Sequence, residues 1–273
     1  DFLNPDLKNV YYISKLKFTL QYPAELAPIK KTDNKEEIYK KLAAVSTYLD
    51  ILLARRIWNF RSFSYSDMQF NMYSLVKEIR RKNLSDLTDA LYKKLKEDPN
   101  KFSENPYFYL HQGNRFYIHY LLARITDFIE VSSGGSSKFQ EYMATGINKY
   151  EVEHIWARHY ERHPDEFGSE SDFERYRNYI GGLLLLPKKF NTSYGDLTYE
   201  EKVKHYDSQN LLARSLNSLC YEHNPGFIQF IKKYDLPFKS YEHFKKDDLE
   251  ERQRLYLKLA ELVWSPEQLK DYA

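Results

Sequence analysis

The chain has 273 residues, of which 42% are hydrophobic, so it can bury the core of one large domain or of two smaller ones. Its 41 Lys and Arg residues nearly balance its 39 Asp and Glu residues, and the net charge of +2 does not by itself indicate a nucleic-acid binder. A single cysteine, Cys220, excludes an intramolecular disulfide and a cysteine-based zinc site. Any metal site must therefore use His, carboxylate or amide ligands.

No apolar run approaches the roughly 20 residues that span a bilayer, so we expect no membrane partner. The first ten residues, DFLNPDLKNV, lack the basic start and the apolar stretch of a signal peptide, which favours a cytoplasmic location. The sequence does not begin with Met, and we therefore expect it to be part of a longer protein.

The first half of the chain has the pattern of a helical bundle. Apolar residues recur every three or four positions in residues 36–58, which predicts a buried amphipathic helix. A second helix is predicted over residues 66–82 with Ser66 in the capping position, and a third begins at Ser85. Residues 114–130 predict a fourth helix with one apolar side. We assign all of them to a helical domain over residues 1–145.

The pattern changes after a Ser/Gly stretch, EVSSGGSSKFQ, that indicates an exposed loop or a domain joint. Alternating residues in INKYEVEHIW predict a short strand, and GGLLLLP predicts a second, buried strand. Capping boxes at Ser171 to Glu174 and at Thr198 to Glu201 predict helices before and after the second strand. The segment QNLLARSL and the tail after Asn224 are also predicted to be mostly helical.

The order of strand, loop, strand and helix places His154 at the end of the first strand and Asn191 at the start of the helix. This arrangement resembles the ββα-metal motif of the HNH nucleases, in which a hairpin and a helix grip one divalent ion. The segment Val152 to Leu216 resembles in particular the C-terminal HNH domain of the GmrSD-type (type IV) restriction enzymes. The preceding segment LLARRIWNFRSFSYSDMQFNMYSLV is similar to the helical part of such proteins.

The resemblance implies an α+β, mostly α-helical fold, in which a helical bundle carries an embedded ββα-metal (HNH) hairpin-helix motif. The HNH nuclease domain would cover residues 146–273, with the ββα-metal core at about 147–206 and C-terminal helices after it. The implied activity is that of a DNA endonuclease, a phosphodiester hydrolase that nicks or cleaves modified or foreign DNA in anti-phage defence. The implied partners are DNA and a ParB-like, nucleotide-using domain at the N-terminus of the full-length protein.

Phosphodiester hydrolysis needs an activated water molecule and stabilisation of the charge that develops on the phosphate. His154, neutral near pH 7, suits the general base. Glu153 and Asn191 offer hard oxygen ligands, which favour Mg²⁺ or Mn²⁺, a single divalent ion, over zinc. Strand alternation places Glu153 on the face opposite His154 unless the backbone twists there.

The sequence departs from the HNH pattern at one position. Many HNH proteins have an Asn at the start of the second strand that orients the catalytic His, and here that position is Gly182. We expect the orienting bond to come from elsewhere, with Asn178 or a backbone carbonyl as candidates. Lys202 and Tyr206 are expected to anchor the following helix under the site.

Basic residues flank the proposed centre, and a cation there would contact phosphate. The candidates for nucleic-acid binding are Arg158, His159, Arg175, Arg177, Lys188 and Lys189. Ordinary solvated charge is the alternative for each of them. His163 is a weaker candidate, since a solvated loop histidine is the commoner situation.

Two alternatives remain open. The chain is either a nuclease or a degenerate, non-cleaving HNH-fold module, disabled at Gly182, that binds nucleic acid or a partner domain. Retention of both His154 and Asn191 favours the nuclease. The second alternative is a structural helical protein in which His154 is a satisfied core residue, but this explains neither the order of the motif nor the flanking capping boxes.

Overall fold

A computed structural model describes residues 7–273 of the chain. The chain divides into two compact units, one made of the residues up to Asn105 together with Trp264–Ala273, the other of Pro106–Val263. The predicted boundary between residues 145 and 146 therefore lies within the second unit. The physical reason is that the helix Arg115–Ser132, which we assigned to the first domain, packs against both strands of the second.

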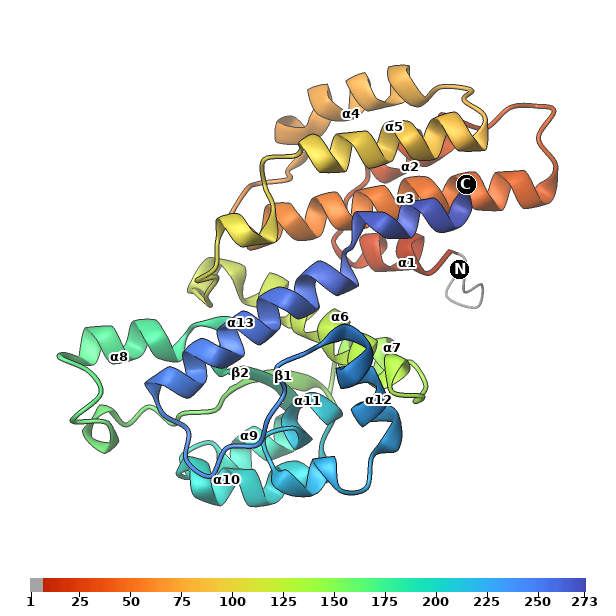
Figure 1. Ribbon diagram of the computed structural model, residues 1–273. Coiled ribbons are helices and arrows are strands. Elements are labelled where there is room, and N and C mark those ends of the chain that lie inside the picture. Colours follow the sequence, from red (N-terminus) through yellow and green to blue (C-terminus); the bar gives the residue numbers. More distant parts are fainter. Residues whose placement is uncertain (1–6) are drawn as a thin grey trace. The chain divides into compact units, whose positions relative to one another are not determined.

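The first unit is built from helices. They are α1 (Lys8–Lys15), α2 (Gln21–Leu26), α3 (Lys35–Trp58), α4 (Tyr65–Ile79), α5 (Leu84–Glu97) and the short 3-10 helix η8 (Pro266–Tyr272) (Figure 1). α3 begins at a capping box, in which the Asn34 side chain accepts a hydrogen bond from the Glu37 backbone N–H and the Glu37 carboxylate accepts one from Asn34, both at 2.9 Å. α3 packs against α1, α2 and α5, so it forms the centre of this unit.

The second unit combines helices with two strands. Its elements are α6 (Arg115–Ser132), α7 (Phe139–Tyr142), β1 (Tyr150–His154), α8 (Glu170–Arg177), β2 (Leu183–Pro187), α9 (Lys188–Tyr194), α10 (Tyr199–His205), α11 (Leu211–Arg214), α12 (Pro225–Tyr234) and α13 (Lys246–Val263). The predicted class is therefore confirmed at the level of a mostly helical chain with a small antiparallel sheet.

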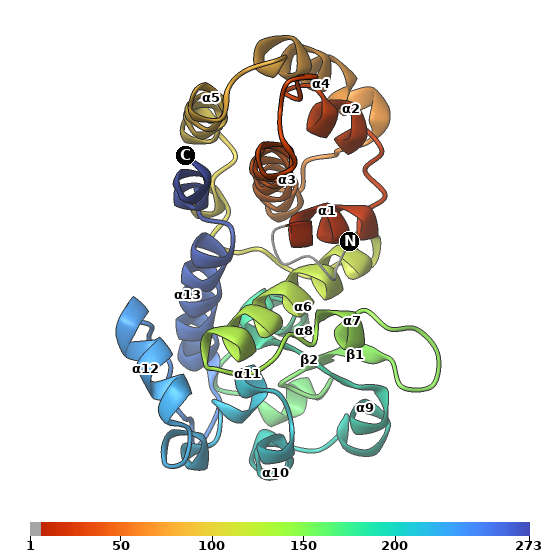
Figure 2. The same cartoon turned by 90° about the vertical axis from the view of Figure 1, so that its right-hand side faces the viewer.

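The two strands form an antiparallel hairpin in which Tyr150 lies opposite Pro187 and His154 lies opposite Leu183. α6 lies on one side of the hairpin, and α9 and α10 lie on the other (Figures 1 and 2). The four leucines of β2 are each at most 1% exposed, because helices cover both faces of the strand. The chain therefore builds a buried β2 and a β1 whose last residue, His154, keeps partial access to solvent.

Some predicted helix ends were wrong by two or three residues. α4 is capped by Ser64 rather than Ser66, and α8 is capped by Ser169 rather than Ser171. Both segments contain two serines within three residues, and the first of each pair has the extended backbone that a capping residue needs. α4 also ends at Ile79 rather than at residue 82, since Arg81 takes a left-handed backbone conformation (φ 55°).

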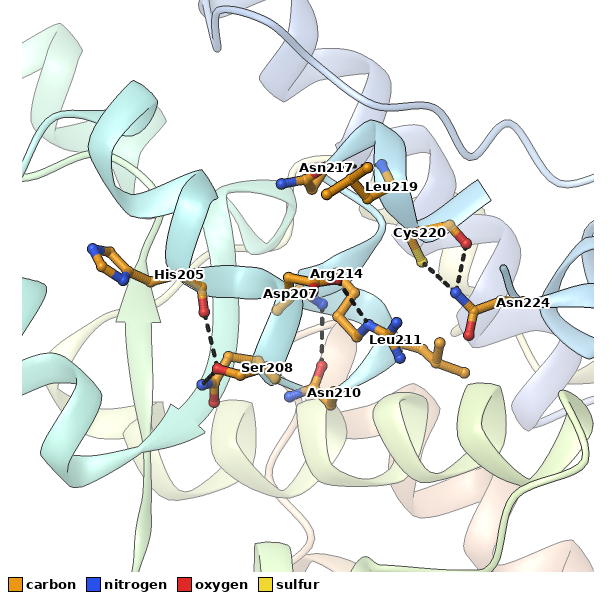
Figure 3. Close-up of polar contacts among 12 residues, drawn as sticks. His205, Asp207, Ser208, Asn210, Leu211, Arg214, Asn217, Leu219, Cys220 and Asn224 are labelled. Carbon is orange, nitrogen blue, oxygen red and sulfur yellow. Dashed lines mark hydrogen bonds and ion pairs between the residues drawn. The ribbon is translucent and has the colours of Figure 1, made fainter. Parts of the chain in front are cut away.

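The segment that predicted a helix over residues 209–216 forms the four-residue helix α11. Figure 3 shows the polar contacts of this region, where the Asn210 side chain caps α11 by accepting a hydrogen bond from the Ala213 backbone N–H at 3.1 Å. The same side chain donates to the backbone carbonyl of Leu185 in β2 at 2.7 Å. Asn210 thus ties α11 directly to the hairpin.

α13 supports the start of β2. The Gly181 backbone N–H donates to the Gln253 side chain at 2.8 Å, and the Tyr256 hydroxyl donates to the Leu183 carbonyl at 2.5 Å. A Cβ atom on Gly181 would lie 2.5 Å from the Gln253 backbone nitrogen, so only glycine allows this close approach. α13 therefore satisfies buried backbone groups at the end of the hairpin where His154 lies.

None of the helices between residues 7 and 273 has the length and apolar character that a membrane span requires.

Candidate active site

His154, the last residue of β1, is held by a side chain from the end of α8. The imidazole Nε2 lies 3.0 Å from Asn178 Oδ1. The orientation of this amide is fixed because Asn178 Nδ2 donates to the Glu174 carbonyl at 2.8 Å. Oδ1 therefore accepts a hydrogen bond from Nε2–H, and the lone pair of the neutral ring is on Nδ1.

Asn178 is itself fixed by backbone pairing. Its carbonyl accepts a hydrogen bond from the Leu110 N–H at 2.8 Å, and Ile180 N–H donates to the Phe108 carbonyl at 3.0 Å. The segment before α6 thus runs antiparallel to residues 178–180, with an isolated β-bridge between Tyr109 and Tyr179. The structure brings Asn178 and His154 together. This is the arrangement expected if Asn178 orients the imidazole in place of the Asn that many HNH proteins have at the position of Gly182.

The surroundings of His154 keep its ring neutral. Burial, together with the nearby guanidinium of Arg177, lowers the pKa of His154 to about 3, and the bond with Asn178 opposes this shift. Arg177 is placed there because its Nε donates to the Trp156 carbonyl at 3.0 Å. At pH 7 the imidazole is therefore uncharged.

Glu153 lies on the other face of β1, as strand alternation predicts. Its carboxylate Oε1 lies 2.6 Å from Lys202 Nζ, and both side chains are buried, with the residues 6% and 0% exposed. The same ammonium also donates to the His154 backbone carbonyl at 2.9 Å. Burial raises the pKa of Glu153 and lowers that of Lys202, and the attraction between the two groups opposes both shifts. Lys202 in α10 thereby contacts both Glu153 and His154.

Asn191 lies in α9, the helix that follows β2 and packs against both strands. Its Oδ1 is buried and has no hydrogen-bond partner among the described residues. The neighbouring Phe190 stacks on Tyr206 with ring centroids 5.5 Å apart, which fixes the helix against the segment after α10. A buried amide oxygen without a donor is costly unless a cation or a water molecule meets it.

The described residues include no group of three or more His, Cys, Asp or Glu side chains arranged to hold a metal ion. A single Mg²⁺ or Mn²⁺ that keeps most of its waters needs fewer protein ligands than such a group supplies. The free Oδ1 of Asn191 fits an ion of this kind. Only the second carboxylate oxygen of Glu153 is left for an ion, since Oε1 is occupied by Lys202.

The six predicted phosphate-binding residues have different surroundings. Arg158 and Arg175 are exposed and form ion pairs with Glu174 and Asp172, whereas Lys188 and Lys189 are exposed at the start of α9. The other two are Arg177, which lies beside His154, and His159, whose Nδ1 lies 2.6 Å from Glu161.

His163 belongs to an aromatic cluster. Its ring stacks on Phe173 and lies 4.8 Å from Trp156, and its Nδ1 lies 2.9 Å from the Glu166 carboxylate. These contacts pack His163 into the aromatic cluster beneath the loop that follows β1, which indicates a role in the fold.

One basic residue near the site was missed by the sequence analysis. Arg115, the first residue of α6, is exposed, and its positive charge is among those that lower the pKa of His154. Helical periodicity identified the segment but carried no signal that would place Arg115 beside residue 154, because the two are joined only by packing of α6 on the hairpin.

The family model of the C-terminal domain of the GmrSD restriction endonucleases matches residues 66–259. The chain belongs to this family. No curated relative and no solved structure was found to match it. The GmrSD match includes β1, β2, α9 and most of α13, so the elements that position His154, Asn178 and Asn191 are all within the family domain.

Proposed function

We propose that this GmrSD C-terminal domain is a metal-dependent endonuclease of the HNH type that nicks or cleaves DNA. The observation that carries the proposal is a neutral imidazole whose Nε2 is held by Asn178 and whose Nδ1 is left as the proton acceptor. In this proposal His154 is the general base that takes a proton from the attacking water, and Asn178 positions it.

Asn191 and Glu153 would hold the divalent ion. When bound, Mg²⁺ or Mn²⁺ would stabilise the negative charge that develops on the phosphate oxygens. The chain's own residues contribute three things. Asn178 orients the His154 ring, Asn191 offers its buried Oδ1, and Lys202 holds Glu153 and the His154 backbone in place. Arg158, His159, Arg175, Arg177, Lys188 and Lys189 are proposed phosphate contacts, with Lys188 and Lys189 the most accessible.

The full-length protein and its biological role are also part of what we propose. The domain would act as the nuclease half of a GmrSD-like protein in anti-phage defence, next to a ParB-like, nucleotide-using domain, on modified or foreign DNA. Such DNA is met inside the cell, so a cytoplasmic location belongs to the same proposal.

The alternative is a non-cleaving module that binds nucleic acid or a partner domain. One observation favours it: the Lys202 ammonium already occupies an oxygen of Glu153 and competes with a metal ion for that carboxylate. The alternative predicts DNA binding without any metal-dependent product.

Conversion of supercoiled plasmid to nicked and linear forms separates the two functions. The purified chain is incubated with Mg²⁺, with Mn²⁺ or with EDTA, beside His154→Ala and beside a control, His223→Ala, which alters an exposed histidine in the loop before α12. We expect metal-dependent nicking by the wild type and the control, and none by His154→Ala. Equal nicking by His154→Ala would remove His154 from the mechanism, and no cleavage by a folded wild type that binds DNA would favour the alternative.

A further inference from the structure

A second feature of the hairpin is a cavity of about 370 Å³ that runs beside β1. It lies within the second compact unit, between the start of α6 and the segment that leads from α7 into β1. Its lining residues are Arg115, Phe116, His119, Met143, Ala144, Thr145, Lys149, Tyr150, Glu151 and Val152. The volume falls in the range of about 300–1,000 Å³ that is typical of small-ligand pockets.

The cavity is lined by residues of β1, the strand that ends at His154. Tyr150, Val152 and His154 are every second residue of β1, so their side chains lie on the same face of the strand. Neighbouring residues of this set are about 7 Å apart along the strand, and the three cover about 13 Å. A DNA strand rises about 3.4 Å for each nucleotide, and this face therefore matches about four nucleotides. Arg115 lines the cavity, and its positive charge is among those that lower the pKa of His154.

The charges of the cavity suit a phosphodiester strand. The Arg115 guanidinium is exposed and makes no ion pair or hydrogen bond within the part of the chain that the model describes. Lys149 pairs with Glu151 at 2.7 Å, so two cations and one carboxylate leave one net positive charge. Burial lowers the pKa of His119, which is therefore neutral at pH 7 and adds no charge.

The cavity also offers an aromatic surface. Phe116 is 49% exposed although it is a large apolar side chain, and it follows Arg115 directly in α6. Tyr150 also lines the cavity, and its hydroxyl donates to Glu141 at 2.7 Å. An exposed ring next to an unpaired guanidinium is the combination that binds one nucleotide, by stacking on the base and attraction to the phosphate.

We propose that this cavity binds the nucleotide adjoining the scissile phosphate, with Phe116 stacking on its base and Arg115 contacting its phosphate. The inference rests on the proposed nuclease function and extends it, because it assigns strand binding to the start of α6 rather than to the hairpin and α9 alone. The expected recognition is independent of sequence, since every base has a face that can stack.

The test uses a fluorescein-labelled single-stranded DNA oligonucleotide in EDTA, so that binding is measured by anisotropy without cleavage. We expect Phe116→Ala to raise the Kd about 5- to 100-fold, the range of a lost base-stacking contact, and Phe116→Tyr to bind like wild type. Arg115→Gln should make the salt dependence of binding shallower by about one phosphate contact. The matched controls are Phe70→Ala and Arg254→Gln, both at exposed positions that are not among the residues lining the cavity.

A second readout reports the base itself. A single-stranded oligonucleotide with 2-aminopurine should change its fluorescence on binding wild type and Phe116→Tyr, but not on binding Phe116→Ala. Unchanged binding and fluorescence in Phe116→Ala and Arg115→Gln would overturn the inference, as would a wild type that does not bind the oligonucleotide. A protein that binds through these residues but never nicks plasmid would contradict the nuclease proposal and leave the nucleotide site supported.

Discussion

The buried ion pair between Glu153 and Lys202 gives the sharpest stability prediction. Lys202→Met removes the ammonium from a carboxylate that is 6% exposed and 2.6 Å away. Removing one partner of such a pair leaves an uncompensated buried charge and costs about 3–5 kcal/mol. The loss of the hydrogen bond to the His154 carbonyl at 2.9 Å adds about 1 kcal/mol. We therefore expect Lys202→Met to destabilise the hairpin by about 4–6 kcal/mol.

The double variant Glu153→Leu, Lys202→Met removes both charges. Apolar pairs of similar volume often replace a buried ion pair without loss, so only the cost of the unpaired His154 carbonyl, about 1 kcal/mol, should remain. The exposed pair of Lys239 and Glu251, 2.5 Å apart, is the control, and Lys239→Met should cost less than about 1 kcal/mol.

Amide hydrogen exchange of peptides covering residues 150–154 and 183–187 measures the free energy of opening of the hairpin itself. This choice avoids assuming that the two compact units unfold together. The reasoning is refuted if Lys202→Met lowers the opening free energy by less than about 1 kcal/mol. The single variant Glu153→Leu completes the comparison. The reasoning is equally refuted if the double variant loses as much opening free energy as the two single variants lose together, because the two charges would then not be coupled.

Three further outcomes follow from the site. Asn178→Ala should lower the nicking rate about tenfold, because it removes the hydrogen bond that positions His154, and an unchanged rate would remove Asn178 from the mechanism. Gly182→Asn should destabilise the hairpin by about 1–3 kcal/mol, because a Cβ there lies 3.1 Å from Leu249 and 3.3 Å from the Arg177 carbonyl; a stable variant with faster nicking would contradict this. His154, with its pKa lowered to about 3, binds a proton in the unfolded but not the folded state between about pH 3 and 6.5, so stability should fall as pH falls through that window by at most about 1.4 kcal/mol per unit. His154→Gln should flatten that slope in a metal-free urea titration, and identical slopes would refute the shift.

The elements that local pattern determines could be predicted from the sequence. Periodicity gave α3 and α6 to within a residue or two, alternation gave β1, and the run of four leucines between glycines and a proline gave β2. The capping box at Thr198 correctly marked the start of α10, and the prediction that Lys202 anchors this helix under the site agrees with its contacts to Glu153 and the His154 carbonyl.

Features that depend on packing between distant segments could not be predicted in this way. Asn178 was one of two candidates for orienting the imidazole, and only the fold shows that it lies within 3.0 Å of His154. Nothing in the sequence places Arg115, 39 positions earlier, beside the hairpin, or gives α13 a place under Gly181. The proposed catalytic, metal and phosphate contacts remain predictions for the assays described above.

The support of β2 by α13 also affects how the protein is made. The Tyr256 hydroxyl meets the Leu183 carbonyl across 73 positions of the chain. At about 5–20 residues per second, a ribosome needs about 4–15 s to make that stretch. During this time the hairpin lacks the groups that satisfy its Gly181 and Leu183 backbone. A chain that ends before α13 should therefore have a less stable hairpin, because the start of β2 keeps unsatisfied backbone groups.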